Sequence, residues 1–252
     1  MFTRLFASRK ASPRPPAAPP GTRIYAVGDI HGRIDLLRRL HAMIAEDAAA
    51  APDRRRVAVH LGDYVDRGEF SRQVIDLLLD EPLAGFEPVY LRGNHEEMML
   101  AFLEDPAMGP TWMVNGGDAT LYSYGVGHQE GATPEERHGR LQRALQEALP
   151  ARHLAFLRGL GLHHLEGDYL FVHAGIVPGR PLEQQDSQDL LWIREEFIHS
   201  TADHGSCVVH GHTIVPAPDI RANRIGIDTG AFFTGVLTCV VLDGHDQRIL
   251  HT

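Results

Sequence analysis

Residues 61–68 read Leu-Gly-Asp-Tyr-Val-Asp-Arg-Gly and close the apolar run of residues 57–61. The run predicts a buried strand that stops at the glycine. Ligands bind outside the carboxyl ends of the strands in open α/β sheets, so two aspartates and an arginine at this point indicate a candidate site. Asp and Gly are also common turn residues, and the stretch alone is equally compatible with a polar turn that caps the next helix.

Two further segments repeat the same arrangement. The apolar run 24–27 is followed by Gly-Asp-Ile-His-Gly at 28–32, and the run 88–91 is followed by Arg-Gly-Asn-His-Glu at 92–96. Helical patterns over 33–47 and 70–79 separate the three runs, which predicts parallel strands linked by crossover helices. The three polar clusters are then expected at one edge of the sheet.

Histidines follow two more apolar runs later in the chain. Residues 169–172 lead into His-Ala-Gly at 173–175, and residues 207–210 lead into Gly-His-Thr at 211–213. Carboxylate and amide oxygens together with imidazole nitrogens suit divalent transition-metal ions. Asp63, in the middle cluster, is placed to bridge two ions.

These five blocks, in this order, resemble the calcineurin-type metallophosphoesterases, and within them the phosphoprotein phosphatase branch; the resemblance spans roughly residues 24–240. It implies an α/β fold in four layers, with two mixed β-sheets in a central sandwich flanked by helices. It also implies two divalent metal ions, with manganese expected and iron or zinc as alternatives. The family places one ion on residues that match Asp29, His31 and Asp63, and the other on those that match Asp63, Asn94, His173 and His212.

The same resemblance suggests how the reaction proceeds. It implies that a hydroxide held between the two ions would attack the phosphorus directly. His95 matches the general acid that protonates the leaving alkoxide, and Asp66 matches the carboxylate that orients it. A neighbouring carboxylate raises the pKa of an imidazolium, which suits an acid that works near neutral pH. Arg67 and Arg194 match the pair that binds the phosphoryl oxygens, where a planar guanidinium binds in a bidentate way.

The resulting interpretation is a metal-dependent serine/threonine protein phosphatase that acts on phosphorylated proteins or peptides. The alternative enzymes are a symmetrical dinucleoside tetraphosphate hydrolase and other small-phosphoester hydrolases. Members of the former group typically carry Ala at the position of Asp66, which favours the phosphatase. A binding module that has lost its chemistry is disfavoured because every ligand position is filled. The physiological substrate, tyrosine or histidine phosphatase activity and the oligomeric state are not readable from the sequence.

Several histidines and two phenylalanines need separate interpretation. His60 is expected in the core or beside the ligands, and His210 is left open, since it shares a strand face with His212. Phe232 and Phe233 stand near the place of a tyrosine-bearing loop in the eukaryotic enzymes. The remaining histidines in polar or helical surroundings are predicted to lie at the surface: His41, His128, His138, His153, His199, His204 and His245.

The rest of the chain predicts supporting structure. Asn94 is expected to cap a helix with Glu97 three residues on, and residues 105–150 are expected to form an insertion over the site with a helix over 134–149. Within it, Trp112, Asn115–Gly117 and Thr120 match a stretch of compact bacterial members of the family, as a substrate-facing wall or a self-packed loop. Another helix is predicted over 150–160. Residues 224–231, 235–242 and 248–251 are expected to be strands of a second sheet.

Composition limits the classes of partner and compartment. The net charge of −9 over 252 residues argues against a nucleic-acid-binding surface. Residues 1–21 contain four basic residues, no acidic ones and many prolines, which predicts a disordered tail, with a transit peptide as the weaker alternative. Residues 22–252 are expected to form a single catalytic domain. Cys207 and Cys239 are expected as buried thiols in a reducing, cytoplasmic setting, and no apolar run is long enough to span a membrane.

Overall fold

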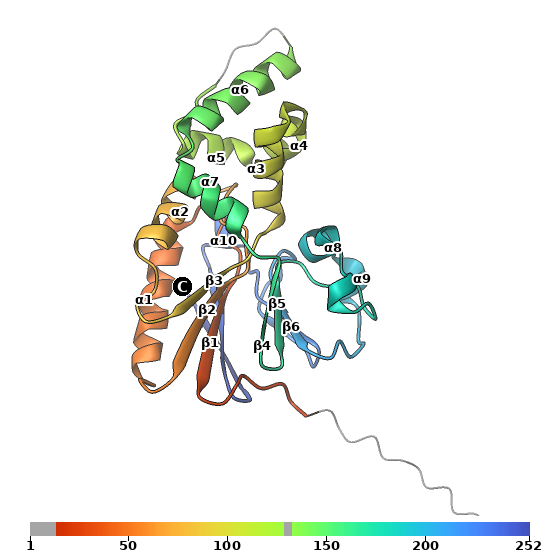
Figure 1. Ribbon diagram of the computed structural model, residues 1–252. Helices are drawn as coiled ribbons and strands as arrows, with labels where there is room; N and C mark the ends of the chain where they lie inside the picture. Colours follow the sequence, from red (N-terminus) through yellow and green to blue (C-terminus); the bar gives the residue numbers. More distant parts are fainter. Residues whose placement is uncertain (1–13, 129–132) are drawn as a thin grey trace, which may run out of the picture.

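Two β-sheets of five strands each face one another in the computed structural model, which describes residues 14–128 and 133–252. The strand order is β10-β9-β1-β2-β3 in the first sheet and β4-β5-β6-β8-β7 in the second. Helices cover the outer face of each sheet (Figure 1). Both sheets mix parallel and antiparallel pairs, so the predicted four-layer sandwich is confirmed.

The centre of the first sheet is a pair of crossover units. β1 (Thr22–Val27), β2 (Arg55–His60) and β3 (Glu87–Tyr90) are parallel neighbours, connected through α1 (Ile34–Ala49) and α2 (Ser71–Asp80). The last residues of β1 and β2, Val27 and His60, are partners in the register. The polar residues after each strand therefore emerge at one edge, as predicted.

The C-terminal strands extend this first sheet. β9 (Thr238–Asp243) pairs antiparallel with β1, and β10 (Asp246–His251) pairs antiparallel with β9 at the edge. The prediction that these strands belong to the second sheet is therefore wrong. The local hydrophobic pattern identifies a strand, but it does not show with which distant strand that strand pairs.

The second sheet is built around three parallel strands, β5 (Tyr169–Val172), β6 (Cys207–His210) and β8 (Arg224–Gly226). The antiparallel strands β4 (His163–Glu166) and β7 (Asp219–Ile220) flank them. The strand predicted over 224–231 ends at Gly226, and α10 (Ala231–Thr234) starts soon after. The intervening residues turn towards the strand ends that carry the candidate ligands.

Alternation along β1 explains the layers. Ile24 and Ala26 belong to a core that includes Phe171 and Val209 of the second sheet, whereas Tyr25 and Val27 belong to a core that includes side chains of α1 and α2. A third cluster packs β5 and β6 against α8 (Ser187–Trp192) and α9 (Glu195–Ile198), after the short η2 (Leu182–Gln184). Successive strand residues point to opposite faces, so each sheet contributes to two cores.

The predicted insertion is mainly helical. After α3 (Asn94–Glu104) come η1 (Pro106–Met108), α4 (Gly109–Val114) and α5 (Gly117–Ser123), then α6 (Pro134–Ala148) and α7 (Ala151–Gly159). The last two match the predicted helices, while α4 and α5 were not predicted because glycines interrupt their sequence. In Figure 1, α3 to α6 gather at one end of the molecule.

Residues 14–21, the described part of the predicted tail, lie against the sheets. Ala17 and Ala18 are buried, Ala18 N–H donates to the Gly244 carbonyl, and Asp168 N–H donates to the Ala17 carbonyl. The rest of that predicted tail, residues 1–13, lies outside the described residues. None of the helices in the described ranges combines the length and apolar character that crossing a bilayer requires.

Two of the histidines predicted at the surface are buried. His41 Nε2 lies 3.1 Å from His60 Nε2, and His153 lies between the Tyr124 hydroxyl and Asp76. Each sits on a helix face that packs against the protein, which the polar neighbours in the sequence concealed. His60 is buried with a side-chain partner, as predicted.

Candidate metal centre and phosphoester site

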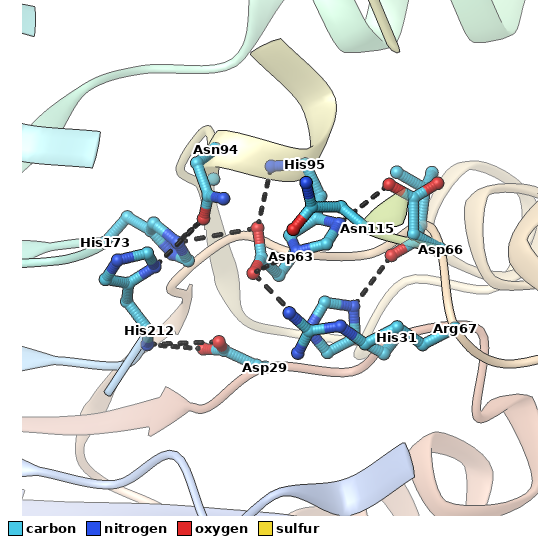
Figure 2. Close-up of polar contacts among 12 residues, drawn as sticks. Asp29, His31, Asp63, Asp66, Arg67, Asn94, His95, Asn115, His173 and His212 are labelled. Atoms are coloured by element: carbon cyan, nitrogen blue, oxygen red, sulfur yellow. Dashed lines mark hydrogen bonds and ion pairs between the residues drawn. The ribbon is translucent and has the colours of Figure 1, made fainter. Parts of the chain in front are cut away.

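All ten predicted site residues lie at one end of the two sheets, and Figure 2 shows nine of them with their polar contacts. The loops after β1, β2, β5 and β6 and the start of α3 deliver eight buried side chains: Asp29, His31, Asp63, Asp66, Asn94, His95, His173 and His212. Arg67 is half-buried and Arg194 is exposed at the rim. The expectation that strand ends converge here is confirmed for every block.

Asp63 stands at the centre of the cluster. Its Oδ2 lies 3.4 Å from His31 Nε2, and its Oδ1 lies 3.4 Å from His173 Nε2. Two groups of potential ligand atoms share this carboxylate, one with His31 and His95 and one with His173 and His212. A single carboxylate between two donor groups is the arrangement that bridges a pair of cations.

Asn94 joins the second group through its side-chain oxygen. Asn94 Oδ1 lies 2.9 Å from both His173 Nε2 and His212 Nδ1. Oxygen and imidazole donors in this mixture suit divalent transition ions. His173 is oriented by its Nδ1, 2.9 Å from the Leu61 carbonyl, and His31 by its Nδ1, 2.8 Å from the Val65 carbonyl. Fixing the far nitrogen of a ligand histidine leaves the near one free for the metal.

The protonation states favour cation binding. Burial lowers the pKa of His31 to about 3 and that of His212 to about 2, and it also lowers the pKa of His173. These rings are therefore neutral at physiological pH, which is the form that binds a metal. Burial alone raises the pKa of Asp63, but the surrounding histidines, His173 foremost, lower it overall. The central carboxylate is ionised.

Asp228 is a further buried carboxylate at the site, beside Asp29 and Asp63, that the sequence did not single out. Burial and the neighbouring charge of Asp63 together raise its pKa to about 6. Burial also raises the pKa of Asp29, as do Asp228 and Asp63. Three acidic groups in one buried cluster repel one another, and divalent cations relieve that repulsion. The donor set and its excess of negative charge therefore fit bound metal ions.

Strained backbone is concentrated in this site. Within the described ranges, the non-glycine residues with positive φ are His31, Asp63, Asp66, Arg67 and His212, with φ between 45° and 72°. Each costs on the order of 1 kcal/mol or more, so surrounding contacts must hold it. Such outliers cluster where side-chain direction matters more than local stability.

Glu96 forms many of the contacts that hold this strained backbone. The sequence analysis assigned Glu96 no role at the site. Its buried carboxylate accepts N–H bonds from Asp63 at 2.9 Å, Tyr64 at 2.8 Å, Val65 at 3.2 Å and Gly93 at 2.9 Å. The cap of α3 is therefore Gly93 with Glu96, so the predicted pair Asn94 and Glu97 is wrong by one residue. That shift makes Asn94 the first helical residue and clamps the Asp63 loop to the helix.

Gly93 also allows a close approach of the two loops. A Cβ at position 93 would lie 2.0 Å from Asp63 Oδ1. A side chain there is therefore excluded, and α3 can begin directly beside the central carboxylate.

His95 and Asp66 form a buried pair beside the donor cluster. His95 Nδ1 lies 2.7 Å from Asp66 Oδ2. Burial lowers the pKa of His95, but Asp63 and Asp66 outweigh it and raise the pKa overall. The same carboxylate accepts bonds from Trp112 Nε1 at 2.9 Å and Thr120 Oγ1 at 2.7 Å. Two of the insertion residues matched in the sequence thus hold the carboxylate of the His95–Asp66 pair.

The two arginines lie on different sides of the cluster. Arg67 Nη1 is 3.0 Å from His31 Nε2, and its guanidinium lies over the Phe232 ring at 4.7 Å. Arg194 Nη1 donates to the His212 carbonyl at 3.2 Å. Figure 2 also draws Asn115, from the turn between α4 and α5, among these side chains. Cationic groups on two sides suit an anionic phosphoryl group.

His210 packs below the loop that carries His212. Its ring lies 5.1 Å from that of Phe197, and its Nδ1 is 3.1 Å from the Gly211 carbonyl. His210 therefore packs against α9 on one face of the second sheet, and the histidine that contacts Asn94 in the donor cluster is His212.

The chain belongs to the calcineurin-like phosphoesterase family, whose model matches residues 22–231. This confirms the resemblance drawn from the five sequence blocks. The protein is therefore a hydrolase of a family that uses divalent metals, with His and Asp residues positioned for them.

Relatives of the chain carry names from two substrate classes. The chain is 29% identical over 224 residues to serine/threonine-protein phosphatase 2 of Salmonella typhimurium, covering 85% of this chain and 90% of the relative. It is 26% identical over 233 residues to the asymmetrical bis(5'-nucleosyl)-tetraphosphatase PrpE of Bacillus thuringiensis, covering 85% and 88%. A symmetrical bis(5'-nucleosyl)-tetraphosphatase of Aromatoleum aromaticum is 30% identical over 156 residues; the match covers 62% of this chain but only 45% of that longer relative.

Solved structures agree on the fold. A putative diadenosine tetraphosphatase superimposes with a TM-score of 0.58 at 20% identity, covering 93% of this chain and 98% of that one. A cold-active protein tyrosine phosphatase gives a TM-score of 0.55 at 15% identity, covering 91% and 78%. At such identities the likeness concerns architecture.

Proposed function

We propose that this protein removes phosphate from phosphoserine and phosphothreonine in proteins or peptides. The observation that carries the proposal is the buried His95–Asp66 pair, with 2.7 Å between Nδ1 and Oδ2, beside the donor cluster on Asp63. A serine or threonine alkoxide leaves poorly unless it is protonated, so a positioned acid is of most use on an alkyl phosphate. A nucleotide phosphate leaves a phosphoanhydride readily without that help.

The site fits two divalent cations, for which we propose manganese, with iron and zinc as alternatives. His31 and Asp63, which share one donor group, would hold one ion together with Asp29, the ligand that the family resemblance adds. Asp63, Asn94, His173 and His212 would hold the other. Bound at such a site, divalent ions supply an activated water and neutralise charge at the phosphoryl group.

The chain's own residues then bind the substrate and move the proton. Arg67 and Arg194 bind the phosphoryl oxygens from two sides of the cluster. His95 holds its proton on Nε2 and donates it to the leaving oxygen, while Asp66 fixes the tautomer through Nδ1. Trp112 and Thr120 keep that carboxylate in place, so the acid is oriented before substrate arrives.

The proposed setting is the cytoplasm. Cys207 and Cys239 are both buried and unpaired, as expected of thiols in a reducing compartment. The proposed partner is a phosphorylated protein or peptide. Dinucleoside tetraphosphate hydrolysis is the rival, because several relatives are named for it.

The decisive measurement is turnover by metal-stripped protein reloaded with manganese, on a phosphoserine peptide and on diadenosine tetraphosphate in parallel. We expect the peptide to be preferred, and His95→Asn to slow its hydrolysis by about 10²–10⁴-fold. His199→Asn makes the same change at an exposed histidine and serves as the control. A preference for the dinucleotide that survives His95→Asn would replace the proposal with the rival, and no turnover of either would exclude both.

A further inference from the structure

A hollow of about 570 Å³ opens beside the site, between α4–α5 and α6. Cavities of this size hold ordinary ligands. The apolar part of its wall comprises Met113, Leu121, Val126 and Leu141. Leu121 and Val126 are buried, while Tyr122 stands 75% exposed at the edge. All of these residues belong to the insertion, none of them to the donor cluster.

Arg67 connects the hollow to the site. Its guanidinium reaches His31 on one side, and the same residue lines the hollow on the other. Arg67 N–H donates to the Gly116 carbonyl at 3.1 Å, which ties the α4–α5 turn to the phosphate-binding loop. Gly116 has φ of 97°, and a Cβ there would lie 2.8 Å from the Arg67 nitrogen. The hollow therefore begins at Arg67, the arginine that we propose binds the phosphoryl group.

The charges of the wall indicate what it binds. Glu69 and Asp118 offset Arg67 and Arg137, and His128 adds a polar ring. Because Arg67 is committed to the phosphoryl group, the other described residues of the wall carry no excess of positive charge for further phosphates. The apolar side chains of the wall, among which Met113 and Leu141 are half-buried, instead suit a large apolar group.

We propose that this hollow binds a large apolar or aromatic side chain of the phosphoprotein substrate, within three residues of the phosphorylated one. The range follows from chain geometry, since each extended residue spans about 3.5 Å and the hollow adjoins the arginine that holds the phosphoryl group. The inference rests on the proposed phosphatase function and names the sequence feature that the enzyme selects.

Phosphoserine peptides with a single leucine in an alanine–glycine background test the proposal. The leucine is moved from three positions before to three positions after phosphoserine, and kcat/KM is measured with manganese. We expect about a tenfold gain at one or two positions, corresponding to partial burial of a leucine. Ala119→Trp fills the hollow from α5 and should abolish this preference while p-nitrophenyl phosphate turnover stays within about twofold.

Two further variants guard against trivial outcomes. Tyr122→Ser changes the exposed edge without risk to the core and should weaken the leucine preference. Val114→Ser alters an 88% exposed residue of the same insertion that does not line the hollow, and should leave the preference intact.

If the wild type turns over all leucine peptides equally, the proposed apolar subsite is wrong, but the proposed phosphatase function stands. Turnover of p-nitrophenyl phosphate with none of any phosphopeptide overturns the proposed function as well. If Ala119→Trp slows diadenosine tetraphosphate and leaves the peptides unchanged, the hollow holds a nucleobase and the peptide proposal is wrong.

Discussion

Asp66→Asn isolates the support that His95, the proposed general acid, receives from its carboxylate partner. The carboxylate accepts His95 Nδ1 at 2.7 Å, Trp112 Nε1 at 2.9 Å and Thr120 Oγ1 at 2.7 Å. An amide offers a single acceptor atom and directs its NH₂ at one of these donors. His95 thereby loses a charge-assisted bond worth about 1.5–3 kcal/mol. If that bond acts fully in the transition state, the rate falls by about 10–100-fold.

The dependence on the leaving group separates an acid role from a structural one. Phenyl phosphate needs a proton on its leaving oxygen, whereas p-nitrophenyl phosphate departs more easily. We therefore expect Asp66→Asn to reduce kcat for phenyl phosphate by the full factor and kcat for p-nitrophenyl phosphate by much less. Because Asp66 also raises the pKa of His95, the alkaline limb of the kcat profile should move to lower pH.

The control is Asp53→Asn, the same change in the exposed loop between α1 and β2. In Asp66→Asn the amide NH₂ faces another donor, which alone lowers the free energy of unfolding by about 1–3 kcal/mol. Circular dichroism and urea unfolding therefore have to establish that the variant is folded. Equal losses of kcat on both esters, with an unmoved alkaline limb, would refute the general-acid reasoning and leave Asp66 a purely structural role.

Three further predictions concern Glu96, His41 and the metal ions. Glu96→Gln should lower the free energy of unfolding in urea by about 2–4 kcal/mol, because its amide cannot accept all four N–H groups that the carboxylate accepts; an unchanged midpoint would contradict the clamp. Burial lowers the pKa of His41 to about 4 from 6.5, so below pH 6.5 the unfolded chain binds a proton that the folded chain does not, and lowering the pH from 7.5 to 5 should remove about 2 kcal/mol of stability that His41→Gln does not lose. Removing metal with a chelator should abolish turnover and lower Tm by about 5–10 °C, with manganese at 100 times its Kd restoring both, whereas Tm of Asp63→Asn should not respond to the metal.

The sequence carries most of the candidate site because its residues follow short apolar runs. Parallel strands place their carboxyl ends at one edge, so Asp29, Asp63 and Asn94 converge once the crossover pattern is recognised. Features set by contacts between distant parts of the chain left no comparable signal in the sequence. The pairing of β9 with β1, the burial of His41 and His153, and the turn of Asp228 into the site each depend on tertiary contacts.

The helical insertion contacts the proposed catalytic pair through Asp66. This residue has φ of 72°, and its N–H donates to Ser71 of α2 at 3.1 Å and to Thr120 of α5 at 2.8 Å. Trp112 of α4 contacts the opposite end of the same residue, at its carboxylate. A shift of α4 or α5 therefore changes both the strained backbone and the carboxylate that His95 depends on. The same helices line the hollow beside Arg67, so one insertion builds both the wall of that hollow and the support of Asp66.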